Sequence, residues 1–235
     1  MANHYGQMKM LGLNQLRAAC TLFLLSIFVV SANAKSDAQA RDGQPNIDAL
    51  IILSGEMAGH LRDVKANRQA YMDDFARFEA GPVAVFFDYT SPARTLVEII
   101  GQARFEQFTA EEKRLLVGEM RETYRRYLYE WLHGGVDIAL TAMDINRQEA
   151  AAQFERDKVI EVRLRGAISG LPDITVTAYI AEQRGEWRAF DFSFWGLRYS
   201  SGKRAAFRRR LERGGVEGLA DYMRDKNMAF FEAFQ

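Results

Sequence analysis

An alternation of apolar and polar residues between positions 158 and 194 constrains the fold more than any other feature. Residues 160–164 alternate apolar with charged side chains, residues 174–180 alternate apolar with polar ones, and residues 190–194 carry phenylalanine at every second position. A period of two is that of a β-strand with one buried face. Turn residues at 170–173 and 184–186 separate the segments, so we predict successive strands paired antiparallel.

The chain before this alternation follows helical spacing. We predict helices over 47–80, 92–103 and 110–133, the first broken near Asn67 and ended by Gly81-Pro82. The third begins at a capping box, in which a Thr three residues before a Glu satisfies backbone N–H groups that the first helical turn leaves free. A further strand can start near residue 136, and a last helical region runs from about Lys203 to the C-terminus, with a break at Gly214-Gly215.

The order of these elements predicts an α+β fold in a single domain over residues 46–235. We expect a four-stranded antiparallel sheet, cone-shaped and similar to that of NTF2. The N-terminal helices and the C-terminal helix should pack on its one apolar face, because amphipathic elements must bury their apolar sides against one another.

Residues 1–34 have the composition of a secretory signal peptide. Two basic residues precede an apolar run from Ala18 to Val30, and Ser31-Ala32-Asn33-Ala34 resembles a cleavage site after Ala34. We therefore predict export to the periplasm, followed by a loose polar tail over 35–45. Cys20 lies in this leader, so the predicted mature chain has no cysteine and no thiol chemistry.

Charge and motifs argue against several classes of function. The full chain has 31 basic and 31 acidic residues, and the leader holds two of the basic ones, which leaves 29 minus 31, or −2, for the mature chain. That balance does not indicate nucleic-acid binding. The spacing of His60 and His133 fits no metal motif, and we find no nucleophile elbow or phosphate-binding loop. The sequence therefore predicts no metal and no cofactor.

Asp191, set among phenylalanines, is the one carboxylate that the sequence singles out. An apolar site can raise the pKa of an acid enough to make it a general base, as in small cone-shaped α+β enzymes. The other interpretation is an anchor that hydrogen-bonds a neighbouring strand or pairs with an arginine such as Arg163, Arg165 or Arg188. The anchor is the more common outcome for a carboxylate of this kind.

The stretch from Trp187 to Leu197, WRAFDFSFWGL, resembles the W-K-V-Y-D-V-x-V-E-G-V segment of the MlaC family, also called toluene tolerance proteins. The resemblance covers roughly residues 46–230. Trp195, where the family has an acid, and Arg198, where Ser is common, depart from the pattern. Other landmarks of the family match at Asp88-Tyr89, Gly101, Thr109, Thr123-Tyr124, Phe207, Gly215 to Leu219 and Lys226-Asn227.

This resemblance implies a periplasmic phospholipid carrier with no chemical step. Such a protein shuttles lipid between an outer-membrane lipoprotein complex and an inner-membrane ABC transporter with an MCE-domain protein, which maintains outer-membrane lipid asymmetry. A diacyl phospholipid and a polycyclic lipid such as a hopanoid would both suit the apolar wall. The alternatives are a small enzyme that uses Asp191 as general base and a periplasmic scaffold that binds only protein.

The family fold implies an apolar pocket between helix and sheet. The residues expected to line it are Leu116, Met120, Tyr124, Leu128, Val162, Leu164, Val176, Ile180, Phe190, Phe192 and Phe194. A basic run can form a docking surface for an anionic membrane or an acidic partner, or it can be an ordinary solvated helix face. It consists of Lys203, Arg204, Arg208, Arg209, Arg210 and Arg213.

Overall fold

The computed structural model describes most of the chain after residue 61. The described residues are 47, 50, 59–60, 62–134, 138–142, 145–168, 174–183, 185–194 and 196–232. The predicted signal peptide (1–34), the polar tail (35–45), the turn at 170–173 and Trp195 lie outside them.

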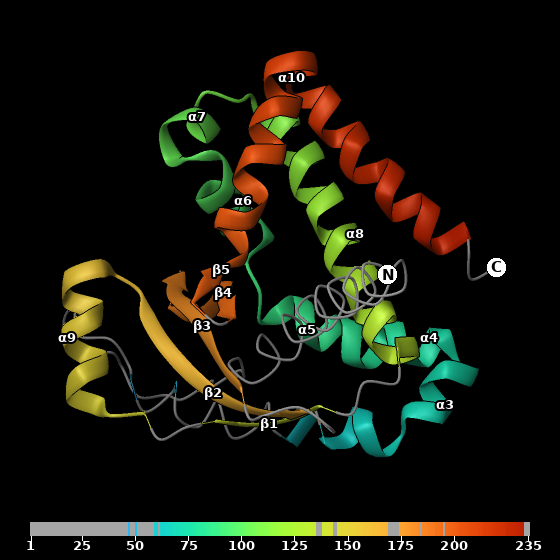
Figure 1. The fold of residues 1–235 in the computed structure, drawn as a ribbon, viewed down its shortest axis with the longest axis vertical. Coiled ribbons are helices and arrows are strands. Elements are labelled where there is room, and N and C mark those ends of the chain that lie inside the picture. Colours follow the sequence, from blue (N-terminus) through green and yellow to red (C-terminus); the bar gives the residue numbers. More distant parts are fainter. Residues whose placement is uncertain are drawn as a thin grey trace, which may run out of the picture.

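Helices and one antiparallel sheet make up the described part of the chain (Figure 1). The helices are α3 (Arg68–Asp73), α4 (Phe75–Phe78), the π-helix η1 (Glu79–Val83), α5 (Ala84–Asp88), α6 (Pro92–Ile100), α7 (Gln102–Glu106), α8 (Ala110–Gly134), α9 (Arg147–Asp157) and α10 (Tyr199–Glu232). The strands are β1 (Ile138–Ala142), β2 (Ile160–Ile168), β3 (Ile174–Gln183), β4 (Glu186–Phe194) and β5 (Leu197–Arg198). The predicted α+β class is confirmed.

The sheet is an antiparallel meander in the order β1-β2-β3-β4-β5. Gln183 pairs with Glu186, so β3 and β4 are joined by a two-residue loop, and Gly185 takes the positive φ of 81° that such loops require. Strands β2, β3 and β4 are those that the alternation predicts, and β1 is the further strand predicted near residue 136. The fifth, β5, has only two residues and leads directly into α10.

The predicted helix starts are confirmed at α6 and α8. The backbone N–H of Thr109 donates to the Glu112 carboxylate at 2.7 Å, and the N–H of Glu112 donates to the Thr109 hydroxyl at 3.2 Å, which completes the capping box. At α6 the Ser91 hydroxyl accepts from the N–H of Arg94, and Pro92 occupies the first helical turn.

The prediction that Gly81-Pro82 ends the first helical region is wrong. Both residues lie inside η1, and the chain continues without interruption into α5. A π-helical turn adds one residue to the loop that each hydrogen bond closes, so it can take up a proline that lacks an N–H. The helical chain therefore continues past Pro82 through a π-helical turn.

Helix α9 is an element that the periodicity did not predict. Asn146 accepts hydrogen bonds from the N–H groups of Gln148 and Glu149, and Lys158 ends the helix in the left-handed conformation. The helix lies along the edge of β2, where the Gln153 side chain accepts from the N–H of Glu161 at 3.1 Å. Asn146 is a residue type that favours a helix start, but the sequence that follows it is too weakly amphipathic to predict a helix.

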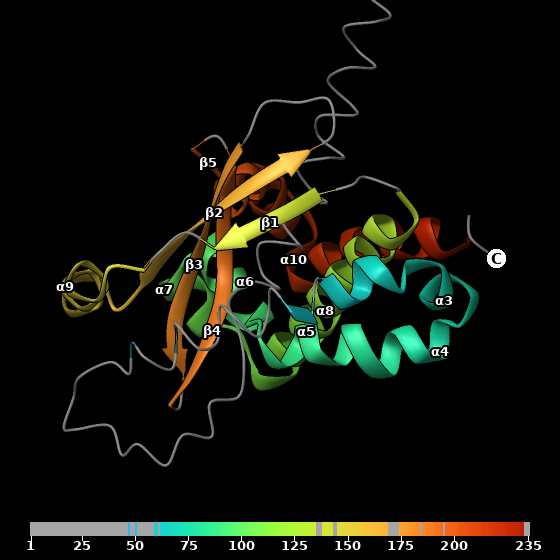
Figure 2. The ribbon, with the colours of Figure 1, turned by 90° about the horizontal axis from the view of Figure 1, so that it is seen from below.

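The helices other than α9 gather on one side of the sheet (Figure 2). Helices α6 and α8 and the start of α10 lie nearest the strands, while α9 stands apart near the start of β2. Gly215, with φ 61° and ψ −154°, breaks α10 into two helical halves, as the Gly-Gly pair predicted. In the part of the chain that the structure describes, no helix is both long and apolar enough to span a membrane.

Candidate functional site

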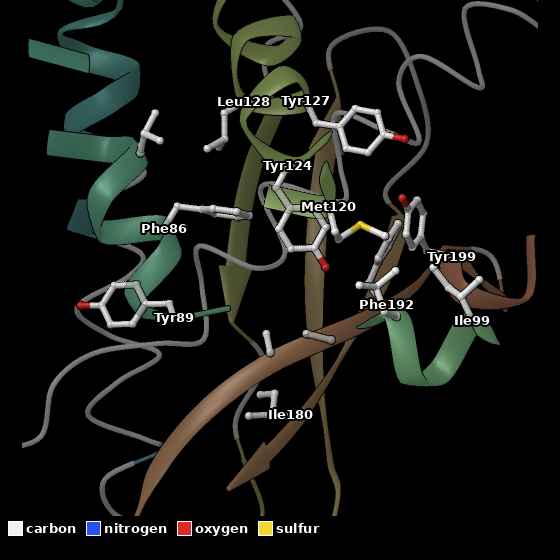
Figure 3. Close-up of a cluster of buried hydrophobic side chains, with 14 of the residues drawn as sticks. Phe86, Tyr89, Ile99, Met120, Tyr124, Tyr127, Leu128, Ile180, Phe192 and Tyr199 are labelled. Atoms are coloured by element: carbon white, nitrogen blue, oxygen red, sulfur yellow. The ribbon is translucent and has the colours of Figure 1, made fainter. Parts of the chain in front are cut away.

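The helix side of the expected lipid-binding set lies in the centre of the molecule. Leu116, Met120, Tyr124 and Leu128 follow one another at intervals of four on α8, and none of them is exposed to solvent. This spacing places all four on one face of the helix. Figure 3 shows Met120 and Tyr124 directed toward the sheet and the neighbouring helices.

The sheet side of the set meets this face. Val162, Val176, Ile180 and Phe192 are each at most 4% exposed, and they belong to the same hydrophobic cluster as the α8 residues. Pairing across the strands explains this, because Val162 and Phe192 both lie opposite Ala178. The facing surfaces predicted from the sequence are therefore brought together. We call this buried region the apolar layer.

Two members of the expected set are placed only by their backbone. Leu164 pairs with Val176, which in turn pairs with Phe194, so the three positions form one row across β2, β3 and β4. The side chains of Leu164 and Phe194 lie outside the described part of the structure.

The prediction that Phe190 shares a face with Phe192 is wrong. A β-bulge shifts the register, so that Tyr179 pairs with Asp191 while the next residue, Ile180, pairs with Ala189. Phe190 is the extra residue and lies on the other side of the strand from the apolar layer. Its ring lies under the Arg94 guanidinium at 5.3 Å and, with Tyr179 and Arg198, lines a hollow of about 380 Å³ rimmed by charged side chains.

A buried hydroxyl pair ties the bulge to the helices. The Thr95 hydroxyl of α6 donates to the backbone carbonyl of Phe190 and lies 2.6 Å from the Tyr124 hydroxyl, and both side chains are fully buried. Since Thr95 has a single proton, Tyr124 must donate to Thr95. Burial raises the pKa of Tyr124, which keeps its proton in place for this bond. Sequence reasoning missed Thr95, because a lone Thr within a helix carries no pattern.

Replacing Thr95 by Val is expected to lower the free energy of unfolding by about 1–3 kcal/mol, because the near-isosteric change removes the buried hydroxyl that bonds both the Tyr124 hydroxyl and the Phe190 carbonyl. Tyr124→Phe removes only the Tyr124 hydroxyl and keeps the bond from Thr95 to the Phe190 carbonyl, so it should lower the free energy of unfolding by less. Urea unfolding measures both variants. Equal stability of Thr95→Val and the unmodified protein would show that the hydroxyl pair is not holding the bulge.

Tyr199 completes the apolar layer from α10 and was also missed. Its ring stacks on Phe192 with centroids 5.3 Å apart and meets Tyr127 of α8 edge-on (Figure 3). Tyr199 stands at the junction of β5 and α10, where no periodic pattern applies.

Asp191 is a structural anchor. It is fully buried, and its two carboxylate oxygens accept from the guanidinium of Arg198 at 2.8 Å, from the hydroxyl and N–H of Ser200 at 2.6 and 3.1 Å, and from the N–H of Phe192 at 2.9 Å. The bonds from Arg198 and Ser200 join β4 to β5 and to the start of α10. The predicted arginine partners are wrong, since the one that pairs is Arg198, which stacks on Tyr179 at 4.1 Å.

Metal-binding chemistry finds no support in the described part of the chain, where no three His, Cys, Asp or Glu side chains are grouped to hold an ion. His60 is exposed, and His133 lies at the last turn of α8, where burial lowers its pKa.

Comparison with known proteins identifies a structural relative. No protein-family model matches this sequence, and no curated protein matches it either. Among solved structures, a phospholipid-binding protein from Ralstonia solanacearum, in complex with a phospholipid, superposes with a TM-score of 0.52 and 17% sequence identity. The match covers 74% of this chain and 97% of that one. The chain therefore has the MlaC-like fold that the sequence resemblance predicted.

Proposed function

We propose that the protein binds a phospholipid and that its acyl chains occupy the apolar layer between α8 and the sheet. The observation that carries this proposal is a deeply buried layer of aliphatic and aromatic side chains in a fold that, in the Ralstonia protein, was solved with a phospholipid bound. Acyl chains need apolar contacts and no hydrogen bonds, and the layer supplies them through Met120, Leu128 and Phe192.

The described side chains of the layer are already in contact with one another, so lipid entry requires α8 and the sheet to move apart. Contacts of this kind are individually weak and reform with an acyl chain in place of a side chain. Methionine is well suited to such exchange, because its unbranched side chain fits gaps of varied shape. Met120 lies at the centre of the layer, beside Phe192 and Tyr199 (Figure 3).

The energetics favour exchange with a bilayer over capture from water. Two acyl chains contain about 30 CH₂ groups, and each gains roughly 0.8 kcal/mol on leaving water, or about 24 kcal/mol in all. That exceeds the free energy of the tightest noncovalent complexes, roughly 18–21 kcal/mol. A carrier that takes its lipid from a membrane moves the chains between two apolar surroundings, so the transfer is nearly balanced and reversible.

The proposal extends to transport across the periplasm. A protein exported by the predicted leader, without cysteine in the predicted mature chain, suits that compartment. There it would pass phospholipid between an outer-membrane lipoprotein complex and an inner-membrane transporter, as the family resemblance implies. The reaction involves no covalent step, in keeping with the role of Asp191 as an anchor.

A labelling experiment tests where the lipid lies. Protein produced in its native host with photo-methionine is purified without added lipid, irradiated and digested, and the peptides are searched for lipid adducts by mass spectrometry. We expect an adduct on Met120, which is fully buried in the layer, and none on Met228, which is 50% exposed on α10.

The two methionines separate the possible results. An adduct on Met228 in place of Met120 would move the lipid site out of the apolar layer. Protein that yields no phospholipid on organic extraction before irradiation would contradict lipid binding altogether.

A further inference from the structure

Charge is distributed unevenly along α10. The half before the Gly215 kink contains six basic residues and a single acid, Glu212. The half after it has more acids than bases. Positive charges this close together on one helical half repel one another and destabilise it, unless a negatively charged group binds there.

The basic residues of the first half differ in what they contact. Lys203 lies over the Tyr199 ring at 5.2 Å, and Arg204 donates to the backbone carbonyl of Glu98 at 3.1 Å. By contrast, Arg208, Arg209 and Arg213 are exposed and form no ion pair with any acid among the described residues. These three guanidinium groups are available to a ligand.

Two of the free arginines line a hollow of about 140 Å³ at the kink. Its lining consists of Ala206, Arg209, Arg210, Arg213 and Tyr222. The first four stand at i, i+3, i+4 and i+7 and so share one face of the helix, where the small Ala206 leaves room between the longer side chains. Gly215, with its φ of 61°, turns the chain so that Tyr222 of the second half closes the hollow. We call this arrangement the arginine cradle.

Basic side chains surround Tyr222. Burial by itself would raise the pKa of Tyr222, but a hydrogen bond from Lys226 and the charges of Lys226, Lys203 and Arg210 lower it. Arg210 and Lys226 also lie over the Tyr222 ring at 4.6 and 4.7 Å. Of the nearby acids, Asp221 already pairs with Arg224 at 2.7 Å.

We propose that the arginine cradle docks the protein on the surface of an anionic bilayer, with the phosphate of a lipid headgroup in the hollow. Guanidinium groups bind phosphate oxygens in pairs, and three arginines line this hollow of about 140 Å³. Surrounding arginines add attraction to the negative surface. The cradle residues are not those of the apolar layer, so this proposal stands or falls separately from cargo binding.

Vesicle sedimentation tests the proposal. The purified protein is mixed with vesicles of phosphatidylcholine alone or of phosphatidylcholine with phosphatidylglycerol, at low and at physiological salt. We expect binding only to the anionic vesicles, weakening as salt is added. Since each arginine near an anionic surface contributes about fivefold to partitioning, the double variant Arg209→Ser/Arg213→Ser should bind roughly 25-fold more weakly.

Two variants control for charge and for folding. Arg163→Ser/Arg165→Ser removes the same charge from exposed positions of β2 and should bind vesicles as the unmodified protein does. Arg209→Lys/Arg213→Lys keeps the charge but loses the paired guanidinium–phosphate hydrogen bonds, so its binding should lie between that of the Ser variant and that of the unmodified protein. The proposal is overturned if the unmodified protein sediments equally with both kinds of vesicle, or if the two Ser variants lose binding to the same extent, which would indicate a response to net charge alone.

Discussion

Replacing Phe192 by Ala is expected to lower the amount of phospholipid that co-purifies with the protein about tenfold or more, whereas replacing Phe190 by Ala is expected to leave that amount unchanged. The two residues are of the same type, lie two positions apart on β4 and are both at most 4% exposed. Only Phe192 lies in the apolar layer, because the β-bulge turns Phe190 to the other side of the strand. A Phe side chain contributes about 1.5–3 kcal/mol through burial, which corresponds to roughly 10- to 150-fold in retention.

The pair also controls for stability. Each substitution removes a buried aromatic ring and should cost about 3–5 kcal/mol in the free energy of unfolding. A general loosening of the fold would therefore reduce the lipid content of both variants. Organic extraction followed by quantitative mass spectrometry, per mole of folded protein, gives the comparison. If Phe190→Ala loses as much lipid as Phe192→Ala, the acyl chains are not confined to the layer.

Replacing Asp191 by Ala is expected to lower the free energy of unfolding by about 3 kcal/mol or more. The change leaves the Ser200 hydroxyl and two backbone N–H groups without their acceptor inside the protein, and it removes the buried partner of Arg198. Arg198 itself is 35% exposed and can be solvated. The cost therefore comes mainly from the buried donors of Phe192 and Ser200.

A surface pair provides the control for this prediction. Asp157 contacts Arg156 at 2.8 Å, but both side chains are more than half exposed, so Asp157→Ala should change stability by less than about 0.5 kcal/mol. Thermal or urea unfolding monitored by circular dichroism measures both variants. A fully stable Asp191→Ala variant that had lost a catalytic activity would instead support the alternative of an enzyme that uses Asp191 as general base.

Much of the fold could be predicted because its patterns are long and local. The capping box at Thr109, the Ser91-Pro92 start and the alternation over 160–180 each follow from contacts within a few residues, and the structure confirms them. The antiparallel meander follows from the short connections. Helix α9 was not predicted, because its sequence is only weakly amphipathic and its position depends on a contact with β2.

The candidate site was predictable only where the period of the strand is unbroken. Counting every second residue groups Val162 with Val176 correctly, but a single extra residue on β4 reverses the side of Phe190. Nothing in the sequence around Ala189 marks the bulge, because the groups that stabilise it come from elsewhere. Thr95 lies 95 positions away in the chain, and its hydroxyl donates to the Phe190 carbonyl at the bulge.

Because of the Thr95–Tyr124 bond, the apolar layer is harder to open at Tyr124 than at Met120. Parting α8 from its neighbours at Tyr124 would break a hydrogen bond between two fully buried hydroxyl groups, at a cost that apolar lipid cannot repay. Parting them at Met120, one turn away, disturbs only dispersion contacts with rings such as Phe192 and Tyr199. If the proposed acyl-chain site is right, α8 would therefore part from the sheet at Met120 and stay bonded at Tyr124, and an acyl chain would enter beside Met120.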